Sequence, residues 1–166
     1  MKLFLTLVVV AASVVIIYFF VLGYLSKKSD PVGIVDDRLA ACSQKPNCVC
    51  SEHPEDAAHF ILPLRLKEES VRSGLSSNSI LLVIKESITE SGGKLLGREA
   101  QPKGALYLAA NYQSSLFGFI DDLEIRLDPH SNLVHFRSSS RVGHSDFGVN
   151  KKRVELLKSA IIRRLQ

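Results

Sequence analysis

Charged side chains between Phe117 and Arg153 are the part of this chain whose residue types and spacing could do chemistry. Arginines near carboxylates form buried ion pairs, or they bind the oxygens of a phosphate or carboxylate ligand in a bidentate way. Carboxylates near a histidine can also act as general acid and base. The members of this charge cluster are Asp121, Asp122, Glu124, Arg137, Arg141, Asp146, Asn150 and Arg153.

A β-hairpin is expected to position the first members of the cluster. Apolar residues recur at alternate positions from Phe117 to Leu127, which is typical of a half-buried strand. Residues 128–132, with the sequence DPHSN, favour a turn because proline fixes φ and Asp and Asn cap tight turns. Val134 and Phe136 then share one face of a second strand. The pattern therefore predicts two antiparallel strands joined by a longer loop.

The register of this hairpin decides which charges meet. If apolar residues pair with apolar residues across the two strands, Glu124 lies opposite Arg137 and Asp121 lies near Ser140. Arg141 has the same parity as Arg137, so both arginines are expected on the face that carries Glu124. We therefore expect arginine–carboxylate pairs on one face of the sheet.

A final helix is predicted after two turn glycines, with Asn150 as its N-cap. Its first turn contains Lys151 and Lys152, although cations are unfavourable at the positively polarised end of a helix. An acidic group such as Asp146 is therefore expected nearby. One interpretation is an internal network of arginines and carboxylates that fixes this helix against the hairpin; the other is a ligand anion on the backbone N–H groups of residues 148–151. We favour the internal network, because buried charges are seldom left unpaired.

Three segments carry a resemblance to a known family. They are KPNCVCSE at 45–52, LFGFIDDLEI at 116–125 and RSSSRVGHSDFGVNKKRVE at 137–155. From Cys42 to its C-terminus, the chain resembles the domain-of-unknown-function family 1499. The resemblance implies a small, secreted or membrane-tethered protein with no assigned activity. Cys50 departs from the family pattern, in which a small residue such as serine is expected.

Three cysteines lie close together, at Cys42, Cys48 and Cys50. In an oxidising compartment Cys42 could form a disulfide with Cys48 or with Cys50. With His53 and His59 the thiols could instead bind Zn²⁺, although the C-x5-C-x-C spacing matches no standard zinc site. A nucleophilic cysteine is a third interpretation, and it would need a depressed thiol pKa. We favour the disulfide or an inert structural role, and we predict no metal site and no cofactor.

The stretch from Leu3 to Leu25 contains no charged residue. A helix of this length crosses the ~30 Å hydrocarbon core of a bilayer. The apolar region of a cleaved signal peptide is only about 7–15 residues long and ends at a small-x-small site. We therefore predict a signal-anchor that crosses the membrane once and contacts the lipid bilayer through residues 3–25. The short N-terminal tail is easily left in the cytoplasm, which would place the rest of the chain outside, in the cell envelope.

The chain has room for one domain beyond this anchor. Residues 1–25 are predicted as the transmembrane anchor, 26–44 as a polar tether and 45–166 as a globular domain. The formal net charge of +4 suits contact with an anionic membrane surface, but the chain lacks the dense basic stripe of a nucleic-acid-binding protein. No nucleic-acid partner is predicted.

The expected fold of the domain is α+β. Two further strands are predicted on either side of the turn sequence QPKG at 101–104, and a helix is predicted between N-cap candidates at 76–78 and the glycines at 92–93. With the hairpin and the final helix, this gives one mainly antiparallel sheet of about four strands and two helices packed on one face.

Two classes of function are open. The first is a membrane-anchored, extracytoplasmic domain that works without catalysis as a binding or scaffold module, with a small anionic ligand or an envelope protein as its partner. The second is a hydrolase-like enzyme that uses Asp121 or Asp146 with His144 and an arginine-bound anionic substrate. A cleft with a raised carboxylate pKa beside His144 would favour the enzyme, whereas a fully paired charge network would favour the first class. We favour the first class.

Overall fold

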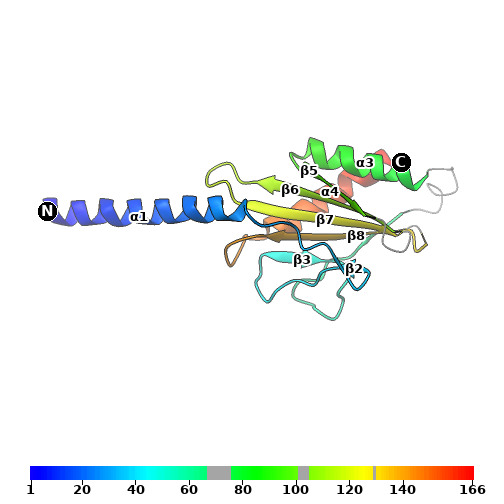
Figure 1. Ribbon diagram of the computed structural model, residues 1–166, viewed down its shortest axis with the longest axis horizontal. Coiled ribbons are helices and arrows are strands. Elements are labelled where there is room, and N and C mark those ends of the chain that lie inside the picture. The colour runs from blue at the N-terminus through cyan, green and yellow to red at the C-terminus, as the bar shows by residue number, and fades with distance from the viewer. Residues whose placement is uncertain (67–75, 101–104, 129) are drawn as a thin grey trace.

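The computed structural model describes residues 1–66, 76–100, 105–128 and 130–166. A long helix, α1 (Lys2–Ser26), projects from one end of a body that contains a sheet and two further labelled helices (Figure 1). α1 is long and apolar enough to cross a membrane, a test that a signal sequence also passes, and the rest of the chain buries none of its most apolar part. Within the described residues it is the one helix with these properties.

The body is built on one mainly antiparallel sheet with the strand order β3-β8-β7-β6-β5, and β4 also pairs with β8. A separate two-stranded sheet contains β1 and β2. The strands are β1 (Ile34–Val35), β2 (Arg38–Leu39), β3 (Cys48–Cys50), β4 (Leu64–Arg65), β5 (Lys94–Ala100), β6 (Leu106–Gln113), β7 (Ile120–Asp128) and β8 (Leu133–Ser140). The α+β class is confirmed.

The prediction of about four strands is wrong in number, because the described part of the chain has eight. The four predicted strands are β5 to β8, which are seven to nine residues long, and β7 and β8 show the apolar alternation of a strand. β1 to β4 are only two or three residues long, too short for any period to appear in the sequence. The predicted turn at 101–104 lies outside the described residues.

The predicted register of the hairpin is confirmed. In the antiparallel ladder of β7 and β8, Glu124 pairs with Arg137 and Asp121 pairs with Ser140. The apolar residues of both strands therefore point to one face of the sheet, and the charged residues of the hairpin meet as expected.

The start of β7 is a correction to the predicted strand, since Ile120 rather than Phe117 is its first residue. A tight loop precedes it, in which the hydroxyl of Ser114 accepts the N–H of Phe119 at 2.9 Å. Phe117 and Phe119 continue the alternation of the strand in sequence, but their rings pack near Phe19 of α1 instead of on the sheet.

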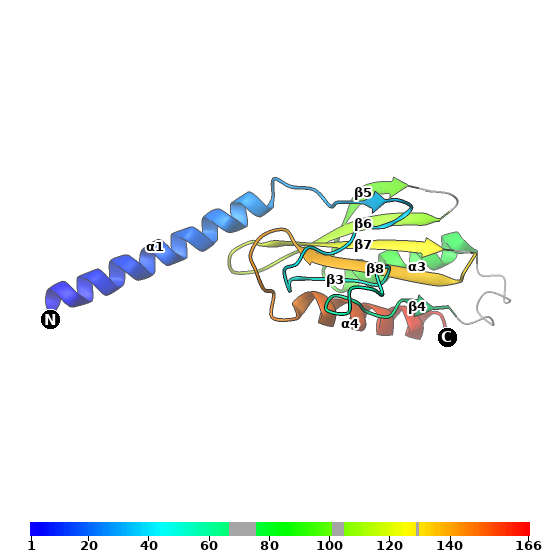
Figure 2. The ribbon, with the colours of Figure 1, turned by 90° about the horizontal axis from the view of Figure 1, so that it is seen from below.

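Helices α3 (Ser77–Glu90) and α4 (Val149–Arg164) cover one face of the sheet (Figures 1 and 2). The Ser76 side chain caps α3 by accepting the N–H of Ser79 at 3.1 Å, as the sequence predicts. Asn150 is not the N-cap of α4; Gly148 holds that position, with φ at +79°. The core between helices and sheet includes the fully buried Ile84, Ile88, Leu123, Ile125, Val134, Phe136, Val154 and Ile161.

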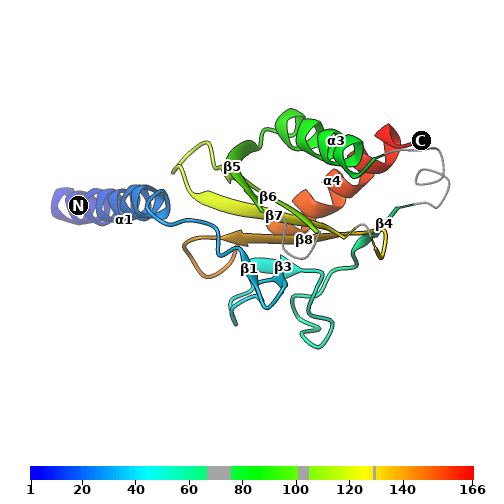
Figure 3. The same ribbon diagram turned by 45° about the vertical axis from the view of Figure 1, so that its right-hand side comes forward.

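The other face of the sheet is covered by the chain between α1 and β3 (Figure 3). Leu39 is fully buried there, in a small apolar cluster with Cys50, Tyr107 and Ala109. The predicted tether at 26–44 therefore contains residues that pack on the sheet. The domain boundaries themselves stay a prediction.

The last two turns of α1 dock on the body. Gly23 has no room for a side chain, because a Cβ atom there would overlap the carbonyl oxygen of Phe117. Ser26 is fully buried, and its hydroxyl accepts the N–H of Ile120 at 3.1 Å. The rings of Phe19 and Phe117 lie 5.2 Å apart. These contacts fix the direction in which α1 leaves the body.

Candidate functional site

The charge cluster divides between the two faces of the sheet. On the face away from the helices, Arg137 donates to Glu124 Oε2 at 2.6 Å, with side-chain exposures of 7% and 0%. Glu124 also accepts the hydroxyl of Tyr107 at 3.0 Å and the N–H of Gly33 at 2.6 Å. Charges buried this deeply need several compensating partners. The pair therefore both stabilises the sheet face and holds the segment around Gly33 on it.

A second ion pair on this face connects the sheet with α1. Arg141 binds Asp122 in a bidentate way, through Nε–Oδ2 at 2.8 Å and Nη2–Oδ1 at 2.7 Å. Its Nη1 donates to the carbonyl oxygen of Ser26 at 3.2 Å and to that of Ser29. One guanidinium thus joins β7, the bend after β8 and the C-terminal end of α1.

A third ion pair on this face, between Arg126 and Glu52, is absent from the predicted cluster. The buried Glu52 accepts from Arg126 Nε at 3.0 Å and Nη2 at 2.5 Å, and from the N–H of Leu39 at 2.6 Å. His135 lies beside this pair, with Nδ1 3.3 Å from Ser51 Oγ. Burial lowers the pKa of His135, and the nearby Glu52 carboxylate opposes this only in part. His135 is therefore neutral at pH 7.

On the helix-covered face, Asp121 pairs with Arg153 of α4 at 2.7 Å. The guanidinium lies over the ring of Tyr112, 4.5 Å from its centroid, and its Nη1 also donates to Ser138 Oγ at 3.1 Å and to the amide oxygen of Asn150. The expected clamp between helix and hairpin is thus made by Arg153. On the opposite face, Arg141 binds the N-terminal segment directly, and Arg137 pairs with Glu124, which accepts the N–H of Gly33.

Asp146 is the acidic group at the N-terminal end of α4. Its carboxylate accepts the N–H of Asn150 at 2.6 Å and that of Gly148 at 3.0 Å. Asp146 therefore accepts hydrogen bonds from two of the backbone N–H groups, those of Gly148 and Asn150, that a ligand anion would bind in the alternative interpretation. Lys151 and Lys152 are exposed to solvent, where water can solvate their charge.

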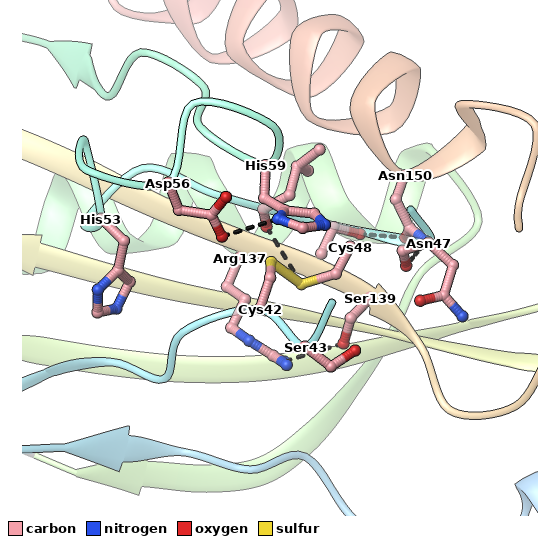
Figure 4. The surroundings of a disulfide bond; sticks show 12 residues. Cys42, Ser43, Asn47, Cys48, His53, Asp56, His59, Arg137, Ser139 and Asn150 are labelled. Atoms are coloured by element: carbon pink, nitrogen blue, oxygen red, sulfur yellow. Dashed lines mark hydrogen bonds and ion pairs between the residues drawn. A yellow bond between two sulfur atoms is a disulfide. The ribbon is translucent and has the colours of Figure 1, made fainter. Parts of the chain in front are cut away.

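The structure pairs Cys42 with Cys48 in a disulfide (Figure 4). Cys50 is free and buried, and burial raises the pKa of its thiol to about 11. A thiol with this pKa stays protonated at neutral pH, which is the opposite of what a nucleophilic cysteine needs. Figure 4 also shows Arg137 close to the disulfide and directed at Ser139, to whose hydroxyl it donates at 2.9 Å.

Both histidines considered as zinc ligands have other partners. His59 Nδ1 lies 2.7 Å from Asp56 Oδ2, and its Nε2 lies 3.0 Å from the carbonyl oxygen of Lys45. His53 Nε2 lies 2.8 Å from the carbonyl oxygen of Leu39. In the described part of the chain, no group of three potential ligand side chains could hold a metal ion.

A pocket of about 440 Å³ lies where α1 meets the loop between β6 and β7 and the loop between β8 and α4. Asp121, His144 and Asp146 all line it, so the structure brings together the three side chains of the hydrolase hypothesis. However, Asp121 is paired with Arg153, and Asp146 accepts two backbone N–H groups at the start of α4. Both carboxylates therefore already have partners within the fold, and a catalytic role would require them to give up these contacts.

Sequence reasoning missed the residues through which the N-terminal segment binds the sheet. Gly23 is the one glycine between residues 2 and 26, which is a signal of close approach to another segment. Glu52 lies within the family segment KPNCVCSE, but nothing in its spacing indicates burial. Ser26 and Gly33 carry no recognisable signal, because their role depends on contacts with residues about a hundred positions away.

A family model described as "Protein of unknown function (DUF1499)" matches residues 38–161, which is well over half of the chain. Comparisons with curated proteins and with solved structures found no match. The matched range contains β2, the whole six-stranded sheet, α3 and nearly all of α4, and hence every residue of the charge cluster. The chain therefore belongs to the DUF1499 family of proteins of unknown function.

Proposed function

We propose that this chain crosses the membrane once and that its folded domain works in the cell envelope, outside the cytoplasm, as a non-catalytic binding or scaffold module. The length and apolar composition of α1 support membrane anchoring. The disulfide between Cys42 and Cys48 supports an oxidising compartment for the domain.

The main support for the proposal is the contact between the charge cluster and the C-terminal end of α1. Arg141 holds Asp122 on the sheet and the carbonyl oxygens of Ser26 and Ser29 at the same time. A scaffold at a membrane needs a domain with a defined orientation to the bilayer, and this contact restricts that orientation. Buried ion pairs are retained in some proteins because they specify one arrangement rather than because they add stability.

The pairing of the charge cluster is what supports a non-catalytic role. The four arginines Arg126, Arg137, Arg141 and Arg153 each have a carboxylate partner. The arginines therefore do not outnumber their local carboxylates in the described residues, and an anionic substrate would have to displace an existing partner. The hydrolase alternative rests on the shared pocket of Asp121, His144 and Asp146.

Labelling of single cysteines in intact cells tests the anchoring and the orientation. Ser159 is exposed on α4, so Ser159→Cys in the full chain is expected to react with a membrane-impermeant maleimide without permeabilisation. Lys2→Cys, at the other end of α1, is the matched control and is expected to react only after permeabilisation. The buried Cys50 keeps the background low.

Two results would overturn the proposal. Ser159→Cys that reacts only after permeabilisation would place the domain in the cytoplasm. Release of the full chain from membranes by an alkaline wash would show that α1 is not a transmembrane anchor.

A further inference from the structure

Aromatic and aliphatic side chains form most of the surface of the pocket between α1 and the body, which Asp121, His144 and Asp146 also line. The ring of Phe19 lies 5.2 Å from that of Phe117 and 6.4 Å from that of Phe119, so α1 and the loop between β6 and β7 share one aromatic cluster. The apolar side chains that line the pocket are Phe19, Leu22, Phe117, Phe119, Val142, Phe147 and Val149. Its volume of about 440 Å³ lies within the range of small-molecule sites.

Phe19 and Leu22 belong to the proposed anchor, α1. Their positions along this helix therefore determine how deep the pocket lies in the membrane. At 1.5 Å per residue, Leu22 lies about 6 Å and Phe19 about 10 Å before the end of α1 at Ser26. α1 is 25 residues long, or about 37 Å, against ~30 Å of hydrocarbon. Both residues therefore lie at the edge of the apolar layer when α1 spans it. Figure 2 shows the two loops of the pocket at the end of the body nearest α1.

Phe147 is an exposed apolar residue that the fold itself does not use. Its side chain is 98% exposed, and its backbone has φ at 53°, a left-handed conformation that is unfavourable for a bulky residue. Leu116 and Val149 are also exposed at this end of the body, by 69% and 49%. Contact with the bilayer would bury this apolar surface.

A cation lies beside the pocket at the level of the lipid headgroups. Lys27 directly follows α1, and its Nζ would lie 3.6 Å from a Cβ atom at Gly118, between the pocket residues Phe117 and Phe119. Lysines at the end of a membrane helix place their ammonium group in the interface, where anionic lipid phosphates attract it. Lys28 is directed elsewhere, with its ammonium 4.8 Å from the centroid of the Tyr24 ring.

We propose that this pocket binds one acyl chain of a bilayer phospholipid and that Lys27 holds the phosphate of the same lipid. The inference rests on the proposed anchoring through α1. A lipid is the occupant that the geometry favours, because Phe19 and Leu22 of the proposed membrane-spanning helix form part of the pocket wall.

Tryptophan quenching tests the position of the pocket, since the chain contains no tryptophan. The full chain is reconstituted in vesicles of phosphatidylcholine and phosphatidylglycerol with brominated acyl chains. Phe147→Trp is expected to be quenched, as is Val14→Trp in the middle of α1, whereas Leu82→Trp on α3 is expected to stay unquenched. An unquenched Val14→Trp overturns the anchoring; a quenched Val14→Trp with an unquenched Phe147→Trp leaves the anchoring standing and overturns the lipid pocket.

Native mass spectrometry of the delipidated full chain, mixed with phosphatidylglycerol in detergent, tests occupancy. The wild type is expected to hold one lipid, and Val142→Phe, which fills the pocket, is expected to lose it. Leu116→Phe is the matched control, because Leu116 lies in the loop between β6 and β7, which borders the pocket, but does not itself line the pocket. Equal lipid binding by Val142→Phe and the wild type would overturn the proposal.

Substitution of single lysines tests the phosphate contact without any change in the core. Lys27→Gln is expected to lower the bound fraction of phosphatidylglycerol several-fold, while Lys28→Gln, one residue away, is expected to leave it unchanged. Equal effects of the two substitutions would mean that the contact with Lys27 is no more than general attraction to anionic lipid, and would overturn the assigned role of Lys27.

Discussion

The two faces of the central sheet are buried by different means. On one face, α3 and α4 contribute apolar side chains such as Ile84 and Ile161, which are fully buried against the strands. On the other face, three arginine–carboxylate pairs lie beneath a short N-terminal segment that contributes only Leu39 as a fully buried apolar side chain. A segment of this length cannot bury enough apolar area to hold itself in place by the hydrophobic effect alone.

The charged face shows how polar contacts can replace that missing area. In each of its three ion pairs, one member also binds a backbone group of the N-terminal segment. Glu124 accepts the N–H of Gly33, Glu52 accepts that of Leu39, and Arg141 donates to the carbonyl oxygen of Ser26. Apolar contacts are non-directional, whereas these hydrogen bonds require one geometry. The apolar face therefore supplies most of the stability, and the charged face determines where α1 is attached.

The largest effect is expected from breaking the most deeply buried pair. Arg137→Leu strands the fully buried Glu124 carboxylate, and removal of one partner of a buried ion pair typically costs about 3–5 kcal/mol. Chemical denaturation of the full chain in detergent micelles measures the loss. Lys151→Leu is the control, because an exposed lysine contributes at most about 1 kcal/mol. Equal denaturation midpoints for the two variants would show that the charged face is not structural.

The ion pair on the helix-covered face is expected to matter less. The side chains of Arg153 and Asp121 are 12% and 17% exposed, so the carboxylate left by Arg153→Leu regains some water. We expect a loss of about 1.5–3 kcal/mol, the range for hydrogen bonds to charged groups. The same denaturation experiment measures it. A larger loss for Arg153→Leu than for Arg137→Leu would reverse the contrast between the faces.

Much of the sheet could be predicted from the sequence, because β5 to β8 are each seven to nine residues long and β7 and β8 show clear apolar alternation. The parity of the hairpin even places Glu124 opposite Arg137 correctly. Parity assigns a side chain to a face, but it does not say what covers that face. That information lies in contacts such as the one between Gly33 and Glu124, 91 residues apart, for which no local pattern exists.

The alternation of Phe117 and Phe119 with the strand residues led to a different error. Both phenylalanines fit the period of β7, yet they lie in the preceding loop and pack against α1. A period of two records only which residues are apolar, and this loop and a strand bury apolar residues against different partners, the loop against α1. The pocket was therefore absent from the predicted site, although three of its polar residues had been singled out.

The docking of α1 can be broken at Gly23, with an effect expected to be smaller again. Gly23→Leu forces a side chain into the carbonyl oxygen of Phe117, and overpacking of this kind typically costs about 1–3 kcal/mol. α1 should separate from the body, so limited proteolysis of the reconstituted chain is expected to cleave more rapidly between residues 27 and 33. Ala12→Leu, on an exposed part of the same helix, is the control. Unchanged cleavage in Gly23→Leu would show that close packing at Gly23 is dispensable.

The smallest expected effect is the change of folding stability with pH that arises from His135, which lies on the charged face. His135 has a lowered pKa in the folded protein because burial disfavours its charged form, while Glu52 and Asp128 partly oppose this and Arg126 adds to it. Between this lowered value and the ordinary value of 6.5, the unfolded chain binds more protons than the folded one. The contribution of His135 to the stability of the fold is therefore complete above about pH 6.5. It is lost as the pH falls from about 6.5 through the lowered pKa of the folded protein.

A comparison of the wild type with His135→Gln isolates this contribution. Urea midpoints of the full chain at about pH 7 and about pH 5 are expected to fall more steeply for the wild type, because only it gains a proton at residue 135 on unfolding in that range. Asp128, whose pKa is lowered below 3.8 by hydrogen bonds from Ser131 and His130 despite its partial burial, acts in a separate window at lower pH. Parallel losses in the two proteins would mean that burial does not keep His135 neutral in the folded protein, and the charged face would then tolerate one more cation than its three ion pairs supply.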